Sequence, residues 1–357
     1  MEDYRIDNHK LIYHPQKVAD WLDGKTVYPI NAEIGLSGAC NHRCVFCCID
    51  YMGYVPHFLS EEIMQKTMSE MCGLGLKSVV FAGNGEPLLN KDAVNIINNT
   101  KKLGIDVAMS TNGVLFTEDV AKECMESISW IRFSTSAGTE ETYHKIHQGQ
   151  DGDLDKVFTN IYNAACLKRK KGMKTVLGVQ IVMTPDNEDE VVLLAQKVKE
   201  LGADQFSVKS LGWNPMTNSD LRNTVDRKEY YAHRDSMINE LESLNDDSFR
   251  AVYRGNRVSK SIETRKYQEC YASPFHVCID ANGEVVPCCV FLGVPVMSFG
   301  NIYENTFEEI WQGEKRRNVL QNLKRTKLSQ CPAECRLSDM NSYLHEIKNP
   351  GEHVNFI

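Results

Sequence analysis

The sequence predicts an α/β protein built as an incomplete (β/α)6 TIM-like barrel with a smaller C-terminal region. Short apolar runs alternate with longer amphipathic segments across residues 27–210, and this alternation favours a parallel sheet with right-handed crossovers. Polar or glycine-containing motifs follow several of the apolar runs, at the strand ends where such a barrel carries its chemistry. Cysteines gather at residues 40–48 and 270–335, which indicates two metal sites on this framework.

Six strands are expected from apolar runs bounded by turn residues. They cover residues 27–36, 77–82, 106–110, 128–134, 174–183 and 206–210. The helices expected between them cover residues 61–73, 92–103, 117–125, 154–171 and 188–202. The first helix has clear start signals, because Ser60 is a favourable N-cap and Glu61 and Glu62 complement the positive end of the helix dipole.

The chain divides into four expected segments. Residues 1–26 form a helical extension and residues 27–210 the barrel. Residues 211–268 form a polar bridge with a sixth helix near 227–244, and residues 269–357 form a second, smaller domain around the C-terminal cysteines. A chain of 357 residues has room for this division, because one large domain of roughly 200–250 residues leaves a remainder of this size.

The composition excludes several classes of protein. The formal charge of -8 argues against nucleic-acid and anionic-membrane partners, and no run of 18 apolar residues is available for a transmembrane helix. The polar, acidic start at Met1–Arg5 is unlike a signal peptide, so we expect a cytoplasmic protein. The 13 cysteines are an odd number in close groups, which favours metal binding over a disulfide framework.

Cys40, Cys44 and Cys47 are the most informative cysteines. Thiolate is a soft ligand that suits iron-sulfur clusters and zinc. Most four-iron clusters take four cysteines, so a compact loop with three cysteines leaves one iron free to bind another molecule. The spacing leaves two alternatives open, half of a zinc site and incidental thiols without a metal.

The spacing of these cysteines, with Phe46 before the last, resembles the cluster loop of the radical S-adenosylmethionine (radical SAM) enzymes. The resemblance implies a [4Fe-4S] cluster held by the three cysteines, with S-adenosylmethionine (SAM) chelating the open iron through its amino and carboxylate groups. An electron from the cluster then cleaves SAM to a 5'-deoxyadenosyl radical that abstracts hydrogen from a substrate. The protein positions and shields this chemistry, and an electron donor such as a flavodoxin or a ferredoxin is implied.

The run Gly83, Asn84, Gly85, Glu86 and Pro87 follows the second predicted strand. It resembles the family's GGEP loop, which holds the methionine amino group of SAM. Small residues allow backbone carbonyls to approach a ligand closely. Asn84 departs from the usual second glycine, but asparagine tolerates unusual backbone angles, so we expect the loop to keep its role.

Further SAM contacts are implied at the ends of later strands. Ser110, Thr111 and Asn112 end the third strand, where relatives contact the ribose or methionine part of SAM. Ser134 ends the fourth strand, but the aspartate of the family's Ser-Ile-Asp-Gly pattern is absent here, which removes that carboxylate.

Three single residues complete the expected binding surface. His147 lies near the position where relatives carry an arginine that meets the SAM carboxylate, and it would substitute for that arginine; a surface histidine is the alternative. Gln180, on the fifth strand, would contact adenine if it lies on the inner side of the strand. Lys209 ends the sixth strand and would hold an anionic or hydroxylated substrate, with a solvated lysine as the alternative.

The C-terminal region resembles the SPASM/twitch extension of radical SAM enzymes, which carries auxiliary iron-sulfur clusters. The resemblance is carried by Val286–Cys289, Gly300–Ile302, Glu308–Trp311 and Cys331–Cys335. The full seven-cysteine pattern is absent, so one auxiliary [4Fe-4S] cluster is expected, with a zinc site as the alternative, because cysteine spacing does not name the metal. The ligands chosen for it are Cys270, Cys288, Cys331 and Cys335.

Cys48, Cys278 and Cys289 are then left over. A spare thiol near the radical would donate a hydrogen atom to a substrate radical, as in some radical SAM epimerases. Cys278 and Cys289 are the candidates for this catalytic role. Cys48 is expected to be an inert buried thiol, which is the commoner fate of a free cysteine.

The sequence leaves three functions open. The first is an enzyme that epimerises or dehydrogenates a small molecule, namely a sugar, aminosugar or nucleotide-sugar. The second is a maturase that modifies a ribosomally made peptide or a protein. The extension at residues 1–26 is too short for a leader-binding domain of roughly 80 residues, which mildly favours the first function. The third is a non-enzymatic zinc-binding protein.

Overall fold

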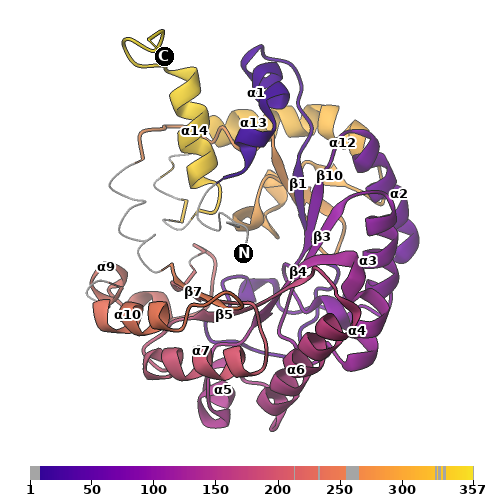
Figure 1. Cartoon of the computed structure of the whole chain (residues 1–357). Helices are drawn as coiled ribbons and strands as arrows, with labels where there is room; N and C mark the ends of the chain where they lie inside the picture. The colour runs from indigo at the N-terminus through magenta and orange to yellow at the C-terminus, as the bar shows by residue number, and fades with distance from the viewer. Residues whose placement is uncertain are drawn as a thin grey trace.

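One sheet of ten strands curves into an open barrel in the computed structural model (Figure 1). The strand order is β10-β9-β8-β1-β2-β3-β4-β5-β6-β7. The structure describes residues 9–356 except 213, 232–233, 255–264, 326–327, 329–330 and 333–334. Parts of the expected N-terminal extension and of the bridge therefore lie outside the described residues.

All six predicted strands form, and they pair in parallel in their sequence order. Their bounds are Asn31–Ile34 (β1), Ser78–Phe81 (β2), Asp106–Thr111 (β3), Ile128–Ser134 (β4), Val176–Val182 (β5) and Gln205–Lys209 (β6). The predicted α/β fold with an incomplete barrel is confirmed, since helices return the chain between parallel neighbours as the alternation requires.

Four further strands extend the sheet at its two edges. β7 (Arg250–Tyr253) pairs in parallel with β6, and β8 (His276–Ile279) pairs in parallel with β1. β9 (Glu284–Val286) and β10 (Gly300–Asn301) follow β8 as antiparallel strands. β8 and β9 form a hairpin that continues the barrel sheet. The expected domain boundary at residue 269 therefore crosses a continuous sheet, because β8 covers the edge that β1 would otherwise expose.

Helices cover the outer face of the sheet (Figure 1). The expected barrel helices are α2 (Glu61–Gly73), α3 (Ala93–Lys102), α4 (Glu118–Cys124), α6 (Asp153–Lys171) and α7 (Val191–Glu200). The helix expected near residues 227–244 is divided into α9 (Arg227–Tyr230) and α10 (Asp235–Ser243). Within the described part of the chain, no helix is both long enough and apolar enough to cross a bilayer.

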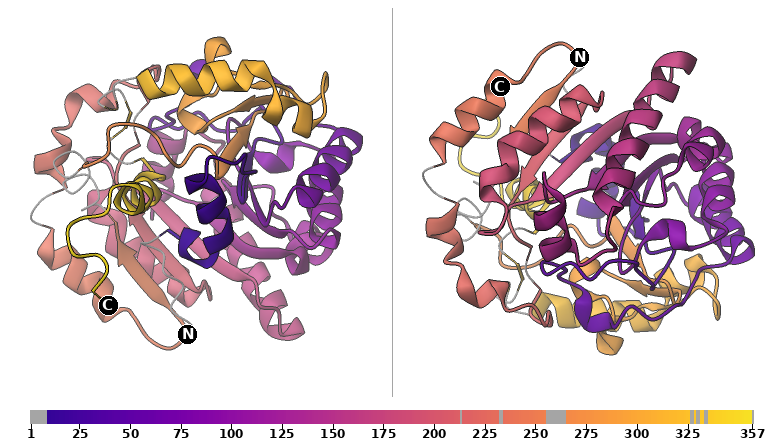
Figure 2. Two further views of the ribbon diagram at one scale, coloured as in Figure 1. Left: turned by 90° about the horizontal axis from the view of Figure 1, so that it is seen from above. Right: turned by 90° about the horizontal axis from the view of Figure 1, so that it is seen from below.

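The longest of the helices that were not expected are α5 (Glu140–His147) and α14 (Ser338–Lys348). Both are short, so each shows only two or three turns of periodicity in the sequence. α14 packs beside α1 around Val18, Phe275 and Leu344, so a helix near each end of the chain lies beside the other (Figure 2). The remaining helices are α1 (Pro15–Leu22), α8 (Leu221–Thr224), α12 (Phe307–Gln312) and α13 (Glu314–Arg325).

The two faces of the sheet differ in chemistry. Along β4, Ile131 and Phe133 are buried in the core against the outer helices, whereas Arg132 and Ser134 are partly exposed on the inner face. Because paired residues of neighbouring strands point the same way, the register carries this polarity around the barrel. The inner face bears Glu33, Ser110, Arg132, Ser134, Gln180, Ser207, Lys209, His276 and Cys278. The inside is a polar surface that is buried near β1 and β8 and more accessible at Arg132, Ser134 and Lys209, unlike the apolar packed interior of a closed barrel.

Trp311 of α12 anchors the C-terminal region to the outside of the barrel. It is fully buried, and its Nε1–H donates to the Val27 carbonyl (2.8 Å) just before β1. Phe307 stacks on its ring (5.4 Å between centroids), and the Arg316 guanidinium lies 3.8 Å from the ring centre. The first N–H groups of α12 donate to the Glu70 carboxylate of α2. One indole therefore joins the C-terminal region to the first strand.

We expect Trp311→Ala to lower the free energy of unfolding by about 3–5 kcal/mol, the range for truncating a buried aromatic side chain. Denaturant unfolding followed by circular dichroism measures the loss. Phe356→Ala is the matched control, since Phe356 is 84% exposed and surface truncations stay within about 0.5 kcal/mol. Equal effects of the two substitutions would contradict the anchoring role.

Candidate active site

The loop after β1 carries the first cysteine group. Cys40, Cys44 and Cys47 are free thiols and are partly buried. The Cys47 backbone N–H donates to the Cys44 carbonyl (3.0 Å), and the backbone N–H groups of Arg43 and Val45 donate to the last carbonyls of α5. The loop, called the cluster loop below, is therefore held to the barrel wall on both sides of Cys44.

The three thiols are spaced for a group larger than one ion. Among the described residues, two groups of three possible metal ligands have their ligand atoms within 4.8 Å of one another. Neither group contains more than one of these three cysteines. A tetrahedral zinc with bonds of about 2.3 Å would draw its thiolates closer together than that. Burial raises the pKa of all three thiols, so a bound metal must displace their protons. The donor set fits a [4Fe-4S] cluster with one free iron.

The Gly83–Pro87 loop after β2 lies directly on the start of the cluster loop. A Cβ atom on Gly85 would lie 2.2 Å from the Ala39 carbonyl oxygen and 2.4 Å from the Ser37 carbonyl oxygen, so only glycine allows this approach. Asn84 is buried, and its Oδ1 has no hydrogen-bond partner. An orphaned acceptor in this position fits a ligand that brings N–H donors, as the amino group of SAM does.

Glu86 is almost fully buried and ties the loops to β3. Its carboxylate accepts hydrogen bonds from Thr111 Oγ1 (2.7 Å), from the Asn112 N–H (2.7 Å) and from the Leu88 N–H (3.2 Å). Asn112 Nδ2 in turn donates to Asn41 Oδ1 in the cluster loop (2.6 Å). Burial raises the pKa of Glu86, and its hydrogen bonds oppose that rise. These residues fix the site, and their contact with SAM stays a prediction.

Ser110, Ser134 and Gln180 lie on the inner face of neighbouring strands. Ser110 Oγ accepts a hydrogen bond from Arg132 Nε (3.3 Å), and Ser134 pairs in register with Gln180. The strand register therefore places Gln180 on the inner side of β5. The three residues form a polar strip across β3, β4 and β5, and their expected contacts with SAM stay predictions.

His147 is a buried residue at the end of α5, with 1% of its surface exposed, and not a surface histidine. Its Nε2 accepts a hydrogen bond from the Ser136 N–H (2.8 Å), and its Nδ1 lies 3.2 Å from Cys44 Sγ. Burial lowers its pKa to about 3, so the ring is neutral. Both ring nitrogens already have partners, and the neutral ring lacks the positive charge of the arginine that relatives carry near this position. These two facts correct the expectation that His147 takes the place of that arginine. Phe46 packs edge-on to the ring (5.5 Å).

Cys278 lies on the inner face next to a second buried histidine. Its Sγ is 3.4 Å from His276 Nε2, and His276 Nδ1 is 3.1 Å from Asn31 Oδ1. Asn31 Nδ2 donates to Ser78 Oγ (2.9 Å), which leaves its Oδ1 facing the histidine. His276 therefore carries its proton on Nδ1 and turns a lone pair toward the thiol.

Cations gather on the same face. Arg336, directly after Cys335, forms an ion pair with the buried Glu33 carboxylate, which raises the Arg336 pKa. Lys209 is the last residue of β6, and its side chain is exposed to water. Desolvation by the surrounding protein is the larger cause that lowers the pKa of Lys209 to about 8, and repulsion from Arg132 is the next. Burial and the nearby Arg336 lower the pKa of Arg132 to about 10.

Cys48 and Cys289 face these cations. Cys48 raises the pKa of Cys289, and Lys209 and Arg336 lower the pKa of both thiols. Burial is the largest effect and raises the pKa of Cys289 to about 11. Cys48 follows the predicted ligand Cys47, and Cys289 follows the predicted ligand Cys288, so thiols from two distant segments lie near the same cations.

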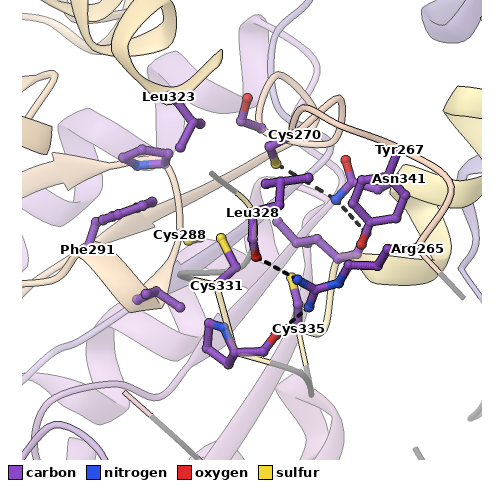
Figure 3. A pocket seen from close by; sticks show the side chains of 15 residues that line it. Arg265, Tyr267, Cys270, Cys288, Phe291, Leu323, Leu328, Cys331, Cys335 and Asn341 are labelled. Atoms are coloured by element: carbon purple, nitrogen blue, oxygen red, sulfur yellow. Dashed lines mark hydrogen bonds between the residues drawn. The ribbon is translucent and has the colours of Figure 1, made fainter. Parts of the chain in front are cut away.

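Cys270, Cys288, Cys331 and Cys335 line one cavity (Figure 3). Asn341 Nδ2 donates to Cys270 Sγ (3.8 Å), a contact that orients a ligand. The lining also includes Arg265, Tyr267, Phe291, Leu323 and Leu328. The structure thus brings the four sequence-chosen cysteines together around one cavity.

Several residues of the site were not identified from the sequence. Each gains its place from a partner far along the chain, such as Asp153 for His42 (3.3 Å between Nε2 and Oδ2), so no local pattern marks it. Of these residues, only Arg336 could have been found from the sequence, because it directly follows the predicted ligand Cys335. The residues missed are His42, Arg132, Asp153, His276 and Arg336.

Two family profiles match the chain. The one described as the radical SAM superfamily matches residues 34–227, and the one described as an iron-sulfur cluster-binding domain, SPASM, matches residues 270–336. The first covers more than half of the chain and includes the cluster loop. The second includes the four cysteines of the C-terminal cavity, and its description favours a cluster there over zinc.

Curated relatives share a quarter to a third of the aligned residues. The chain is 25% identical over 303 residues to a tungsten-containing aldehyde ferredoxin oxidoreductase cofactor-modifying protein of Pyrococcus furiosus, covering 78% of this chain and 80% of that protein. It is 29% identical over 165 residues to a GTP 3',8-cyclase of Clostridium botulinum, covering 44% of this chain and 49% of that protein. The chain therefore spans about half the length of that cyclase.

Solved structures share the fold at low sequence identity. SuiB of Streptococcus suis bound to S-adenosylmethionine superposes with a TM-score of 0.69 at 16% identity, over 95% of this chain and 79% of that chain. The structure of anSMEcpe with bound AdoMet superposes with a TM-score of 0.59 at 17% identity, over 90% and 95% of the two chains. By its family profile, fold and cysteine geometry, this chain belongs to the radical SAM superfamily; it is a radical SAM enzyme with a SPASM domain, and its cofactors are a SAM-binding [4Fe-4S] cluster, SAM and an auxiliary iron-sulfur cluster.

Proposed function

We propose that the enzyme removes a hydrogen atom from a carbon of an anionic small molecule, and that it epimerises or dehydrogenates a sugar, aminosugar or nucleotide-sugar. When bound, the cluster and SAM supply the 5'-deoxyadenosyl radical that takes the hydrogen atom. The observation that carries the proposal is the inner face of the barrel, where the cations Lys209, Arg132 and Arg336 gather near the buried thiol of Cys278 and the half-buried thiol of Cys289.

The cations support a substrate with negative charge. Arg132, Lys209 and Arg336 act on one another electrostatically, and Glu33, the carboxylate within reach of them, is already paired with Arg336. Burial is the largest cause of the lowered pKa values of Lys209 and Arg132, and this crowding of positive charge adds to it. A phosphate or carboxylate beside them would relieve the repulsion. The phosphates of a nucleotide-sugar meet this requirement, and the name of the cyclase relatives also contains a nucleotide, GTP.

The thiols support a hydrogen-atom donor. Burial raises the pKa of Cys278 well above the usual range, so the S–H form that a donor needs persists at neutral pH. His276 and Asn31 hold the direction of that thiol. In epimerisation, the substrate C–H bond breaks, the S–H bond then breaks, and the hydrogen atom forms a new C–H bond on the other face of the carbon. One electron, from a donor such as a flavodoxin or a ferredoxin, and one proton restore the thiol.

Dehydrogenation would use the same site without the thiol step. The substrate radical would lose one electron and one proton, which leaves a new double bond. Cys270, Cys288, Cys331 and Cys335 would hold the auxiliary cluster, which supplies an electron acceptor when bound. The two outcomes differ in whether hydrogen from the protein enters the product.

Modification of a peptide or protein is the second candidate. The solved structures that share this fold include SuiB bound to its precursor peptide SuiA and anSMEcpe bound to the Kp18Cys peptide. The SuiB complex aligns with 95% of this chain, so the framework around the inner face is one that accommodates a peptide in a relative. An acidic peptide would satisfy the same cations.

Replacing a predicted ligand of the first cluster tests the enzyme class. We expect Cys44→Ala to lose reductive cleavage of SAM and part of the absorbance near about 400 nm after anaerobic reconstitution, because thiolate-ligated clusters give that absorbance. Cys166→Ala is the control, since Cys166 lies on α6, on the outer side of the barrel. Full SAM cleavage by Cys44→Ala would remove the basis of the proposal.

Isotope incorporation distinguishes the reaction types. Incubation of the reduced enzyme with SAM and candidate nucleotide-sugars in heavy water should place deuterium at one sugar carbon if a thiol returns the hydrogen, because thiol protons exchange with solvent. Loss of that product in Cys278→Ala or Cys289→Ala identifies the donor by mass spectrometry. If neither substitution matters, the donor assignment is wrong, and an oxidised product without deuterium supports dehydrogenation.

Lys209 gives a test of substrate charge. With UDP-N-acetylglucosamine as the probe, we expect Lys209→Met to weaken binding roughly 10- to 100-fold, the effect of losing one hydrogen bond to a charged group. Binding to the native enzyme should also weaken from pH 7 to pH 9, since Lys209 loses its proton near pH 8. Lys171→Met, exposed at the end of α6, is the control in calorimetry. Equal binding of neutral N-acetylglucosamine would contradict an anionic substrate.

A further inference from the structure

The end of α5 fastens the cluster loop at three points around Cys44. The His147 carbonyl accepts from the Arg43 N–H (3.0 Å), and the Ile146 carbonyl accepts from the Val45 N–H (2.9 Å). The third contact is the His147 ring, whose Nδ1 lies 3.2 Å from Cys44 Sγ. The residues before and after Cys44 and the thiol itself are therefore all held by the same helix turn.

The position of the ring proton follows from the partner of the other nitrogen. The Ser136 backbone N–H points at His147 Nε2 over 2.8 Å. A backbone N–H only donates, so Nε2 must accept and carries no hydrogen. The proton of the neutral ring is then on Nδ1, which faces Cys44 Sγ. The contact with sulfur is an N–H···S hydrogen bond in which the histidine is the donor.

This protonation pattern excludes the most obvious alternative, a separate metal site. His42, Cys44 and His147 offer ligand atoms within 4.8 Å of one another, a spacing that would suit an ion. A metal ligand needs the lone pair of its ring nitrogen, and His147 has a proton there. His42 instead faces Asp153, with 3.3 Å between Nε2 and Oδ2. The three residues are better described as a thiolate with a hydrogen-bond donor beside it.

The surrounding aromatic residues keep the ring in this orientation. His147 is 1% exposed, and Tyr143 stacks on it with 4.4 Å between ring centres and 29° between planes. Phe46 and His42 close two other sides at 5.5 Å and 5.6 Å. A ring held on three sides does not rotate away, so the donor is pre-organised before any cluster binds.

We propose that His147 is a positioning residue that donates a hydrogen bond to the Cys44 ligand sulfur and thereby raises the reduction potential of the SAM-binding cluster. A hydrogen bond to a ligand sulfur withdraws electron density from the metal and stabilises the reduced state. A cluster tuned in this way accepts its electron from the external donor more readily. The proposal depends on the cluster at Cys44 and not on the substrate class, so its failure would leave the substrate proposal untouched.

Potentiometric titration of the full-length, reconstituted enzyme tests this. The titration follows the electron paramagnetic resonance signal that changes when SAM is added, which separates the SAM-binding cluster from the auxiliary one. We expect His147→Leu to shift the midpoint potential to a more negative value, and His147→Gln, whose amide N–H also donates, to restore much of the shift. Tyr143→Phe keeps the stacked ring and should leave the potential unchanged. An unchanged potential in a His147→Leu protein with a full cluster overturns the proposal.

A second measurement covers the case in which His147→Leu fails to hold its cluster. Protein labelled with 15N-histidine, in its native sequence, should show a histidine nitrogen coupled to the reduced SAM-binding cluster in electron-nuclear double resonance. That coupling should disappear in His147→Gln while the cluster signal remains. Absence of the coupling in the native protein, or its persistence in His147→Gln, overturns the assignment without any measurement of activity.

Discussion

The buried Glu86 carboxylate is the contact on which the site depends. It accepts hydrogen bonds from Thr111 and Asn112 at the end of β3, and Asn112 reaches Asn41 in the cluster loop. A buried carboxylate is costly unless it is fully hydrogen-bonded, so these partners must stay in place together. The same packing brings Gly85 against the Ala39 carbonyl. The cysteine loop, the glycine loop and the third strand therefore form one unit, and any cluster held there has a fixed position against the inner face.

The C-terminal region is part of the barrel and does not act as an appendage. β8 pairs with β1, Trp311 bonds to the chain just before β1, and Arg336 reaches Glu33 on β1 itself. These contacts set the four-cysteine cavity at a defined place relative to the cluster loop. They also bring Cys289 and Cys48 toward the same cations. Charged and thiol side chains of the inner face therefore come from both the barrel and the C-terminal region, and a substrate bound there would contact residues of both.

Agreement between expectation and structure is greatest where local signals are strong. The strand expected at residues 128–134 agrees with β4 at both ends, and α2 starts where Ser60, Glu61 and Glu62 predicted. The cysteines chosen as auxiliary ligands line one cavity. The differences lie where local signals are weak or where distant contacts decide. Eight residues of α5 show too little periodicity, and strand pairing, not chain order, places β8 beside β1.

The amino-acid sequence by itself determined the strand-helix alternation, the family and the spacing of the cluster-loop cysteines, because each of these depends on residues that are close together along the chain. Only the tertiary structure decided what lies beside those cysteines. His147 is near Cys44 because β4 and α5 return to the cluster loop, and His276 is near Asn31 because β8 pairs with β1. Hydrogen bonds and charges act over a few ångströms, and residues more than a hundred positions apart come within that range only when the barrel forms.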